Sequence, residues 1–150
     1  MRIGGVIAAL GGVVVVIATF FEMLSVTLGL DAVRETTLSR TYFDTDNGKV
    51  VAALGVVIVV LALTTLVRPN PNFVVSVVMV ASSVATVALA LYDRIDLDGV
   101  TDELRTRLYH GNPAPGIVQA SIGPALYVAM AGGLFATIGA VLAARETSER

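Results

Sequence analysis

The run Ile117–Ala144, IVQASIGPALYVAMAGGLFATIGAVLAA, decides the fold class of this 150-residue chain. From Ala125 onward it holds no charged residue for 20 positions. A helix of that length rises about 30 Å, which is the thickness of the hydrocarbon core of a bilayer. Three more apolar runs precede it, at residues 3–28, 50–67 and 73–92. The sequence therefore predicts one all-α membrane domain (1–150), a bundle of four transmembrane helices in contact with the lipid bilayer.

The composition excludes several classes of function. Hydrophobic residues make up 55% of the chain and charged residues 15%, whereas about a quarter of a soluble domain is charged. The net charge is −2 and no basic patch is present, so we expect no nucleic-acid partner. There is no cysteine and only one histidine, His110, which excludes disulfides, thiolate catalysis and a bis-histidine haem. We expect no catalytic residue, no cofactor and no metal.

The first apolar run is expected to be a retained helix. Residues 3–21 carry no charge, and this run is longer than the apolar core of a secretory signal peptide. The residues after it, Glu22-Met23-Leu24, do not resemble a cleavage site. We therefore expect the helix to continue to Leu28 or Leu30.

Turn chemistry separates the next two spans. Asp44-Thr45-Asp46-Asn47-Gly48 predicts a turn before the second span, because Asp, Asn and Gly accept left-handed backbone conformations. The span at residues 50–67 is rich in Val and Ile, but in lipid a helix is favoured because its backbone satisfies its own hydrogen bonds. Two prolines in the segment 68–72 then predict a tight reversal into the third span.

A short amphipathic helix is predicted in the loop between the third and fourth spans, residues 93–116. Thr101-Asp102-Glu103 has the residue types of a helix start. Val100, Leu104 and Leu108 follow at a spacing of four residues, so they share one face. We expect this helix to lie on the membrane surface.

The distribution of basic residues predicts an orientation in the plasma membrane. Four spans place both termini on one side, together with the short turn at Arg68. That side has arginines in short segments close to helix ends, which count most in the positive-inside rule. The other side has six basic and ten acidic residues, with Glu22 counted together with its long loops. We expect the N- and C-termini to be cytoplasmic and the loops 29–49 and 93–116 extracytoplasmic.

Small residues recur every four positions on the first and last spans. Such stripes let helix backbones approach closely, which drives helix association in lipid. One interpretation is packing within the bundle, and the other is docking against another subunit. The helix-packing residues are Gly4, Ala8 and Gly12 on the first span and Gly132, Ala136 and Ala140 on the fourth.

Glu22 is the one ionisable residue inside a run that is apolar on both sides. An acid within a membrane helix is a functional-site hypothesis by default. It is expected either to be an interfacial carboxylate paired with a loop arginine or to form an intramembrane proton or cation site.

The other polar groups predict no chemistry of their own. Asp44, Asp46 and Asn47 are expected to form a turn and not a calcium loop, since their spacing differs from that of an EF-hand. Ser25, Ser121 and His110 lack a nucleophile motif. Pro124 is expected to begin the fourth helix, with a hinge as the alternative. A solvated loop accounts for the remaining acidic cluster without a divalent cation; its residues are Asp93, Asp96, Asp98, Asp102 and Glu103.

Two segments carry a resemblance to a group of known proteins. They are Asp46-Asn47-Gly48-Lys49-Val50-Val51, which opens the second span, and Gly123-Pro124-Ala125-Leu126-Tyr127, which leads into Gly132-Gly133. In these segments the chain resembles small, largely uncharacterised four-helix membrane proteins of actinobacteria. The resemblance implies an actinobacterial plasma membrane and no particular activity.

Three functions remain as hypotheses. The first is a non-enzymatic accessory or structural subunit that packs against a larger membrane complex, such as a transporter or respiratory assembly. The second is a small transporter or channel that forms a homo-oligomer, for which Glu22 and the hydroxyls of the third span are the candidate groups. The third is a membrane enzyme acting on lipid through Asp93, Asp96 or His110.

Overall fold

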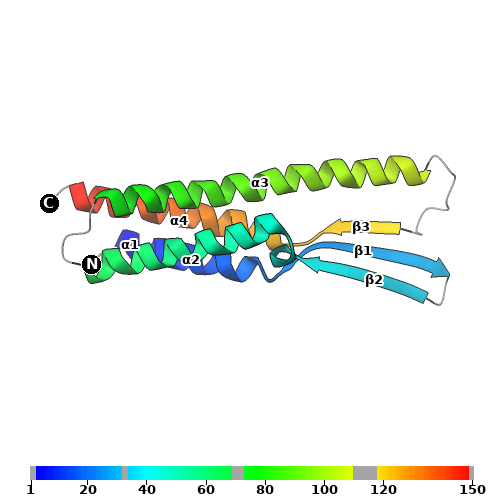
Figure 1. The fold of residues 1–150 in the computed structure, drawn as a ribbon, viewed down its shortest axis with the longest axis horizontal. Helices are drawn as coiled ribbons and strands as arrows, with labels where there is room; N and C mark the ends of the chain where they lie inside the picture. The colour runs from blue at the N-terminus through cyan, green and yellow to red at the C-terminus, as the bar shows by residue number, and fades with distance from the viewer. Residues whose placement is uncertain (1–2, 32–33, 69–72, 110–117, 149–150) are drawn as a thin grey trace.

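The computed structural model describes residues 3–31, 34–68, 73–109 and 118–148. Within these ranges the chain is mostly helical and has a small sheet at one end of a helical bundle (Figure 1). The helices are α1 (Ile3–Ala18), α2 (Asp46–Val67), α3 (Phe73–Tyr109) and α4 (Ala125–Ser148), with the short 3₁₀ helix η1 (Tyr42–Asp44) before α2.

The four helices form an antiparallel bundle in which each helix packs against two neighbours. α1 lies against α2 and α4, and α3 lies against the same two helices from the opposite side. α1 begins and α4 ends at one end of the bundle, while the sheet stands at the other end (Figure 1). The chain therefore runs up and down the bundle. The α1–α2 and α3–α4 connections contain the strands of the sheet.

Small side chains occupy the interior of the bundle and large apolar side chains cover its surface. The fully buried positions of α1 and α4 include Ala8, Ala18, Ala136 and Ala140. Large apolar side chains on a helix surface are unfavourable in water and favourable in lipid, where helix packing depends on small residues. The exposed large apolar residues of α1 and α4 are Ile3, Val6, Leu10, Val13, Val14, Ile17, Leu134, Phe135, Ile138, Val141 and Leu142.

Three helices are long and apolar enough to cross a membrane: α2, α3 over residues 73–100, and α4 over residues 125–146. This confirms the prediction of a mostly helical fold and is compatible with a membrane protein. α1 is apolar but has only 16 residues, which corresponds to about 24 Å. The predicted continuation of this helix to Leu28 is wrong, since it ends at Ala18.

A three-stranded antiparallel sheet replaces the predicted helix continuation and part of the two loops. Its strands are β1 (Glu22–Asp31), β2 (Arg34–Thr41) and β3 (Val118–Ile122), in the order β2-β1-β3. In the register Val26 lies opposite Leu38 on one side and Ala120 on the other. The all-α prediction is therefore wrong for this part of the chain. β1 is favoured here because it pairs with the adjacent strand β2 on one side and with β3, which is far away in the sequence, on the other.

The fourth span is also shorter at its start than predicted, because residues 118–122 form β3. Gly123 and Pro124 separate the strand from the helix, and the Pro124 carbonyl accepts a hydrogen bond from the Val128 amide (3.0 Å). Pro124 thus begins the helix as expected, since a proline at this point loses no helical hydrogen bond.

The predicted separate amphipathic helix is wrong: α3 continues without a break for 37 residues. Its last turns extend past the bundle and run alongside the sheet (Figure 1). No proline or other strong helix breaker lies between Tyr92 and Tyr109, and the single Gly99 weakens a helix by only about 1 kcal/mol. The cap-like residues 101–103 therefore lie within the helix instead of starting one.

Candidate functional site

A polar cluster joins the bundle to the sheet at the point where α1, η1, α2 and α3 meet. The Tyr42 hydroxyl donates a hydrogen bond to Asp93 Oδ2 (2.5 Å). The Asn47 side-chain amide donates one to Asp93 Oδ1 (2.5 Å). Tyr42 is fully buried and Asp93 is only 6% exposed. We call Tyr42, Asn47 and Asp93 the Asp93 junction.

The end of α1 positions η1, which carries Tyr42. After Ala18 the chain turns, and the amide of Tyr42 donates to the Phe21 carbonyl (3.1 Å). The amide of Phe43 donates to the Thr19 carbonyl (2.8 Å). The rings of Phe20 and Phe43 stack with their centroids 5.4 Å apart. Backbone and ring contacts therefore fix η1 against the end of α1.

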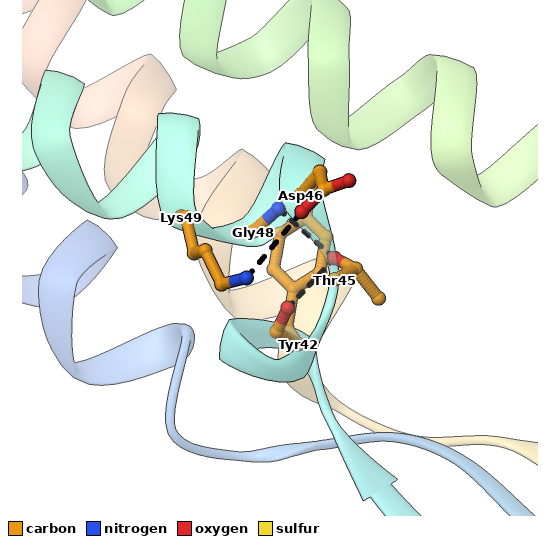
Figure 2. Close-up of polar contacts among 5 residues, drawn as sticks. All are labelled: Tyr42, Thr45, Asp46, Gly48 and Lys49. Atoms are coloured by element: carbon orange, nitrogen blue, oxygen red, sulfur yellow. Dashed lines mark hydrogen bonds and ion pairs between the residues drawn. The ribbon is translucent and has the colours of Figure 1, made fainter.

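The start of α2 positions Asn47. Thr45 caps this helix: its hydroxyl donates to the Tyr42 carbonyl (2.8 Å) and accepts from the Gly48 amide (2.9 Å). A Cβ on Gly48 would lie 2.5 Å from the carbonyl carbon of Tyr42, so only glycine fits here. Figure 2 shows this turn, with the ring of Tyr42 beneath the first turn of α2.

The predicted turn at residues 44–48 is a helix start and not a cation loop. The Asp44 carboxylate accepts from the amide (3.0 Å) and hydroxyl (2.8 Å) of Thr41, and these bonds lower the pKa of Asp44. Asp46 pairs with Lys49 at 3.3 Å (Figure 2). Among the residues that the structure describes, no three acidic or histidine side chains are grouped in a way that could hold a metal ion.

The Asp93 carboxylate is buried beside neutral donors. The neighbouring Arg94 is engaged elsewhere, in an ion pair with Asp98 and a hydrogen bond from its Nε to the Tyr127 hydroxyl (2.8 Å). Burial raises the pKa of Tyr42, and the hydrogen bond to the carboxylate of Asp93 and the charge of that carboxylate raise it further. Tyr42 therefore stays protonated as a donor. A buried carboxylate is tolerated when its oxygens are hydrogen-bonded, and the loss of one donor is costly.

The arrangement is suited to holding three elements together. Each oxygen of Asp93 accepts a hydrogen bond from a different element, η1 or α2, and the acid itself lies on α3. The sequence analysis placed Asp93 in a solvated acidic loop, and that expectation is wrong. Neither Tyr42 nor Asn47 was predicted to be part of this site. The only available signal was the position of Asp93, the first charged residue after an apolar run of 20.

Glu22 lies outside the helices, contrary to prediction. It is the first residue of β1, and its side chain is exposed. Its backbone lies against Gly123, where a Cβ would approach the Glu22 carbonyl carbon to 2.5 Å. Glu22 marks the point where the apolar run gives way to the sheet. The hypothesis of an acid inside the first membrane helix therefore loses its structural basis.

The small residues of the first span face other helices of the same chain. A Cβ on Gly4 would lie 2.8 Å from the Gly139 carbonyl oxygen on α4. A Cβ on Gly12 would lie 3.1 Å from the Gly55 carbonyl oxygen on α2. Ala8 is fully buried between these positions.

The small residues of the fourth span face α1 in the same way. A Cβ on Gly132 would lie 3.0 Å from the Gly11 carbonyl oxygen. Ala136 and Ala140 are fully buried and belong to one apolar cluster with Ala8. Both stripes are thus used within the chain. Three further glycines at these contacts, Gly11, Gly55 and Gly139, lie outside the four-residue repeat that the sequence analysis used.

Hydroxyl groups in the bundle mostly bond to their own helices. Ser83 donates to the Val80 carbonyl (2.9 Å) and Thr86 to the Ser82 carbonyl (2.9 Å). Thr137 on α4 donates to the hydroxyl of Ser83 (3.1 Å), which links the two helices. These bonds use the donor groups internally, as is usual for Ser and Thr in membrane helices.

The remaining candidates are dispersed. Ser25 and Ser121 lie on neighbouring strands, and their hydroxyls are hydrogen-bonded to each other (2.8 Å). Asp96, Asp102 and Glu103 are exposed on the part of α3 beyond the bundle. His110 lies outside the described residues.

No protein-family model matches the chain, and no curated protein matches it. The resemblance to small actinobacterial membrane proteins therefore stays an expectation. The function has to be argued from the geometry of the bundle, the sheet and the Asp93 junction.

Proposed function

We propose that this chain is a non-enzymatic integral membrane protein that crosses the plasma membrane four times and offers its sheet to another membrane protein. In this role it is an accessory or structural subunit of a larger complex. The observation that carries the proposal is the connection of a sheet with open edges to a bundle covered by apolar side chains.

Four uncharged segments of similar length support four crossings. Residues 3–21, 50–67, 73–92 and 125–144 contain no charged side chain. Each of the last three corresponds to about 27–30 Å of helix. α1 is shorter, but the uncharged stretch continues through Thr19, Phe20 and Phe21 before Glu22. The first segment thus ends at the same level as the others, and α1 completes the set of crossings.

The ends of these segments support the proposed orientation. Arg68 follows α2 and Arg145 lies in the last turn of α4, both at the end of the bundle that is farther from the sheet. Basic residues close to helix ends favour the cytoplasmic side. In this orientation both termini are cytoplasmic and the sheet is extracytoplasmic.

The chemistry of the described residues supports a non-enzymatic role. The buried acid, Asp93, accepts hydrogen bonds at both oxygens, and the hydroxyls of Ser83 and Thr86 donate to carbonyls of their own helix. A general base or nucleophile requires a free, positioned group near a space for substrate. The Asp93 junction instead joins η1, which directly follows β2, to α2 and α3.

The edge strand β2 is the part of the sheet that suits a protein partner. It lies at one edge of the sheet, and in Figure 1 this is the edge farther from α3. Its described side chains Thr37, Leu38, Ser39 and Arg40 are exposed. An open edge strand presents backbone donors and acceptors that an extended segment of another protein can pair with. We propose that a second membrane protein supplies such a segment just outside the bilayer.

Photo-cross-linking in native membranes tests this proposal. A photoreactive phenylalanine analogue replaces Leu38 on β2 or, as a control, Phe135 on the lipid-facing side of α4. We expect an adduct of defined mass with another integral membrane protein at position 38 and none at position 135. Leu38→Lys should reduce recovery of the same partner, whereas Leu38→Thr, which keeps a strand-forming residue without a charge, should not.

If no cross-linked adduct forms at either position and the protein is a stable monomer in mild detergent, the proposed role is contradicted. Equal adducts at positions 38 and 135 would also contradict it, because the sheet edge would then have no special part in binding.

A further inference from the structure

Five exposed aromatic side chains surround the bundle at the end that carries the sheet. They come from four elements: the turn after α1, η1, α3 and α4. Their exposed fractions range from 39% to 63%. These residues, which we call the aromatic collar, are Phe20, Phe21, Phe43, Tyr92 and Tyr127.

Direct contacts place the collar residues of α1, η1 and α3 at one level along the bundle. The ring of Phe20 stacks on that of Phe43, and the Phe21 carbonyl accepts the amide of Tyr42 in η1. Tyr42 in turn donates to Asp93, the residue after Tyr92 on α3. The collar thus lies at the same level along the bundle as the Asp93 junction.

A second set of contacts brings α4 to this level. The Arg94 guanidinium lies 5.5 Å from the centre of the Tyr127 ring, and its Nε donates to the Tyr127 hydroxyl (2.8 Å). Arg94 follows Asp93 directly on α3. All four elements that contribute to the collar are therefore connected through neighbouring residues of α3 and η1.

The collar coincides with the boundary between uncharged and charged sequence. Three segments of the bundle contain no charged residue and have one end at the level of the collar: 3–21, 73–92 and 125–144. Directly beyond the first two of these lie Glu22 and Asp93. Tyr and Trp, with amphipathic rings, are enriched at membrane–water interfaces, and this chain contains no tryptophan.

We infer that the aromatic collar lies in the phospholipid headgroup region of one leaflet and fixes the depth of the bundle. The inference rests on the proposed membrane location and adds a specific partner: the glycerol and headgroup layer on the sheet side. The tyrosines place their hydroxyls among the headgroups, while the phenylalanines contact the upper part of the acyl chains.

Two basic residues close to the collar are paired with acidic residues, so the collar does not require an anionic phospholipid as its partner. Arg94 is paired with Asp98, and Lys49, the nearest basic residue of α2, is paired with Asp46. A site built for anionic lipid presents basic side chains without acidic neighbours. The collar is therefore expected to bind zwitterionic and anionic bilayers to the same depth.

Tryptophan fluorescence with brominated lipids tests the depth directly, because each single substitution introduces the only tryptophan of the chain. The full-length variants Tyr92→Trp, Tyr127→Trp, Phe43→Trp and Phe135→Trp are reconstituted in phosphatidylcholine vesicles carrying bromine near the headgroup or near the chain end. Phe135 lies in the middle of the uncharged part of α4 and is exposed on the bundle surface, so it serves as the deep control. Circular dichroism identifies any variant that does not fold, and each of the three collar variants measures the depth independently.

We expect the collar variants to be quenched most strongly by bromine near the headgroup and Phe135→Trp by bromine near the chain end. Adding phosphatidylglycerol should leave this order unchanged. Two results would overturn the collar inference while the membrane location stands: Phe135→Trp is quenched and the collar variants are not, or the collar variants are quenched most strongly by bromine near the chain end, as Phe135→Trp is. If Phe135→Trp is also unquenched, the proposed membrane function fails as well.

Discussion

The hydroxyl of Tyr42 donates a hydrogen bond to the carboxylate of Asp93, although the two residues are 51 positions apart in the sequence. This bond connects the short helix that follows the sheet to the longest helix of the bundle. Together with the bond from Asn47, it satisfies a buried acid and holds the sheet on the bundle. The first two predictions concern this contact.

Tyr42→Phe should lower the free energy of unfolding by about 1–3 kcal/mol, because it removes a donor from a buried carboxylate and leaves the acid in place. The change is measured by chemical unfolding in detergent. Tyr92→Phe is the matched control, since the Tyr92 side chain is 63% exposed, and it should have little effect. Equal effects of the two substitutions would show that the junction does not contribute as described.

The raised pKa of Tyr42 predicts a loss of stability at alkaline pH. A tyrosine whose pKa is higher in the folded state than in the unfolded state stabilises the fold fully below its ordinary pKa. That stabilisation is lost as the pH rises above about 10, where the unfolded chain releases the proton and the folded chain still holds it. Unfolding curves of the wild type between pH 9 and about pH 11 should show this decline.

The Tyr42→Phe variant is the control for the pH dependence. Its stability should decline less steeply over the same range, because the other tyrosines contribute equally to both proteins. Parallel curves for the two proteins would contradict the assignment of the alkaline decline to Tyr42.

Two glycine substitutions should have opposite effects. Gly139→Ala places a Cβ 2.8 Å from both the Ala8 Cα and the Gly4 carbonyl oxygen, so α1 and α4 must separate, and we expect a loss of about 1–3 kcal/mol. Gly99→Ala meets no atom within 4 Å and lies inside α3, so it should be neutral or stabilise the chain by up to about 1 kcal/mol. Thermal unfolding in detergent compares them. A neutral Gly139→Ala would mean that the two helices are not in close contact.

Glu22→Gln should change neither stability nor ion movement, because the side chain is exposed at the start of β1. The free energy of unfolding is expected to stay within about 0.5 kcal/mol of the wild type. Proton flux into proteoliposomes containing either protein should match that of protein-free liposomes. A flux that depends on Glu22 would favour the transporter hypothesis over the accessory role.

The helical part of the fold could be predicted because its signal is local. Absence of charge over about 20 residues identifies a membrane helix from composition alone. The C-terminal end of α2 and the charge-free part of α4 follow this rule, with Arg68 and Arg145 close to the predicted ends. The small-residue stripes could also be predicted from local sequence, because their four-residue spacing reflects the period of a single helix.

The pairing of β1 with β3 and the Asp93 junction depend on contacts between distant segments. Ser25, Val26 and Thr27 pair with residues 37–39 on one side and 119–121 on the other, and a run of apolar residues does not reveal those partners. Asp93 is close in sequence to other acids that are exposed, such as Asp96 and Asp98. It is hydrogen-bonded by residues of η1 and α2 that are 51 and 46 positions away in the sequence. A single sequence contains no local signal for this environment.

Labelling of single cysteines in intact cells tests the central claim most directly, since the chain contains no cysteine of its own. The positions are Ile3→Cys and Arg145→Cys at the end of the bundle farther from the sheet, Ser39→Cys on β2 and Phe135→Cys on the lipid-facing surface. An impermeant maleimide should label position 39 from outside, positions 3 and 145 only after the membrane is opened, and position 135 in neither case. Labelling of positions 39 and 145 from the same side, or of positions 3 and 145 from opposite sides, would contradict a four-helix membrane bundle with its sheet outside the cell.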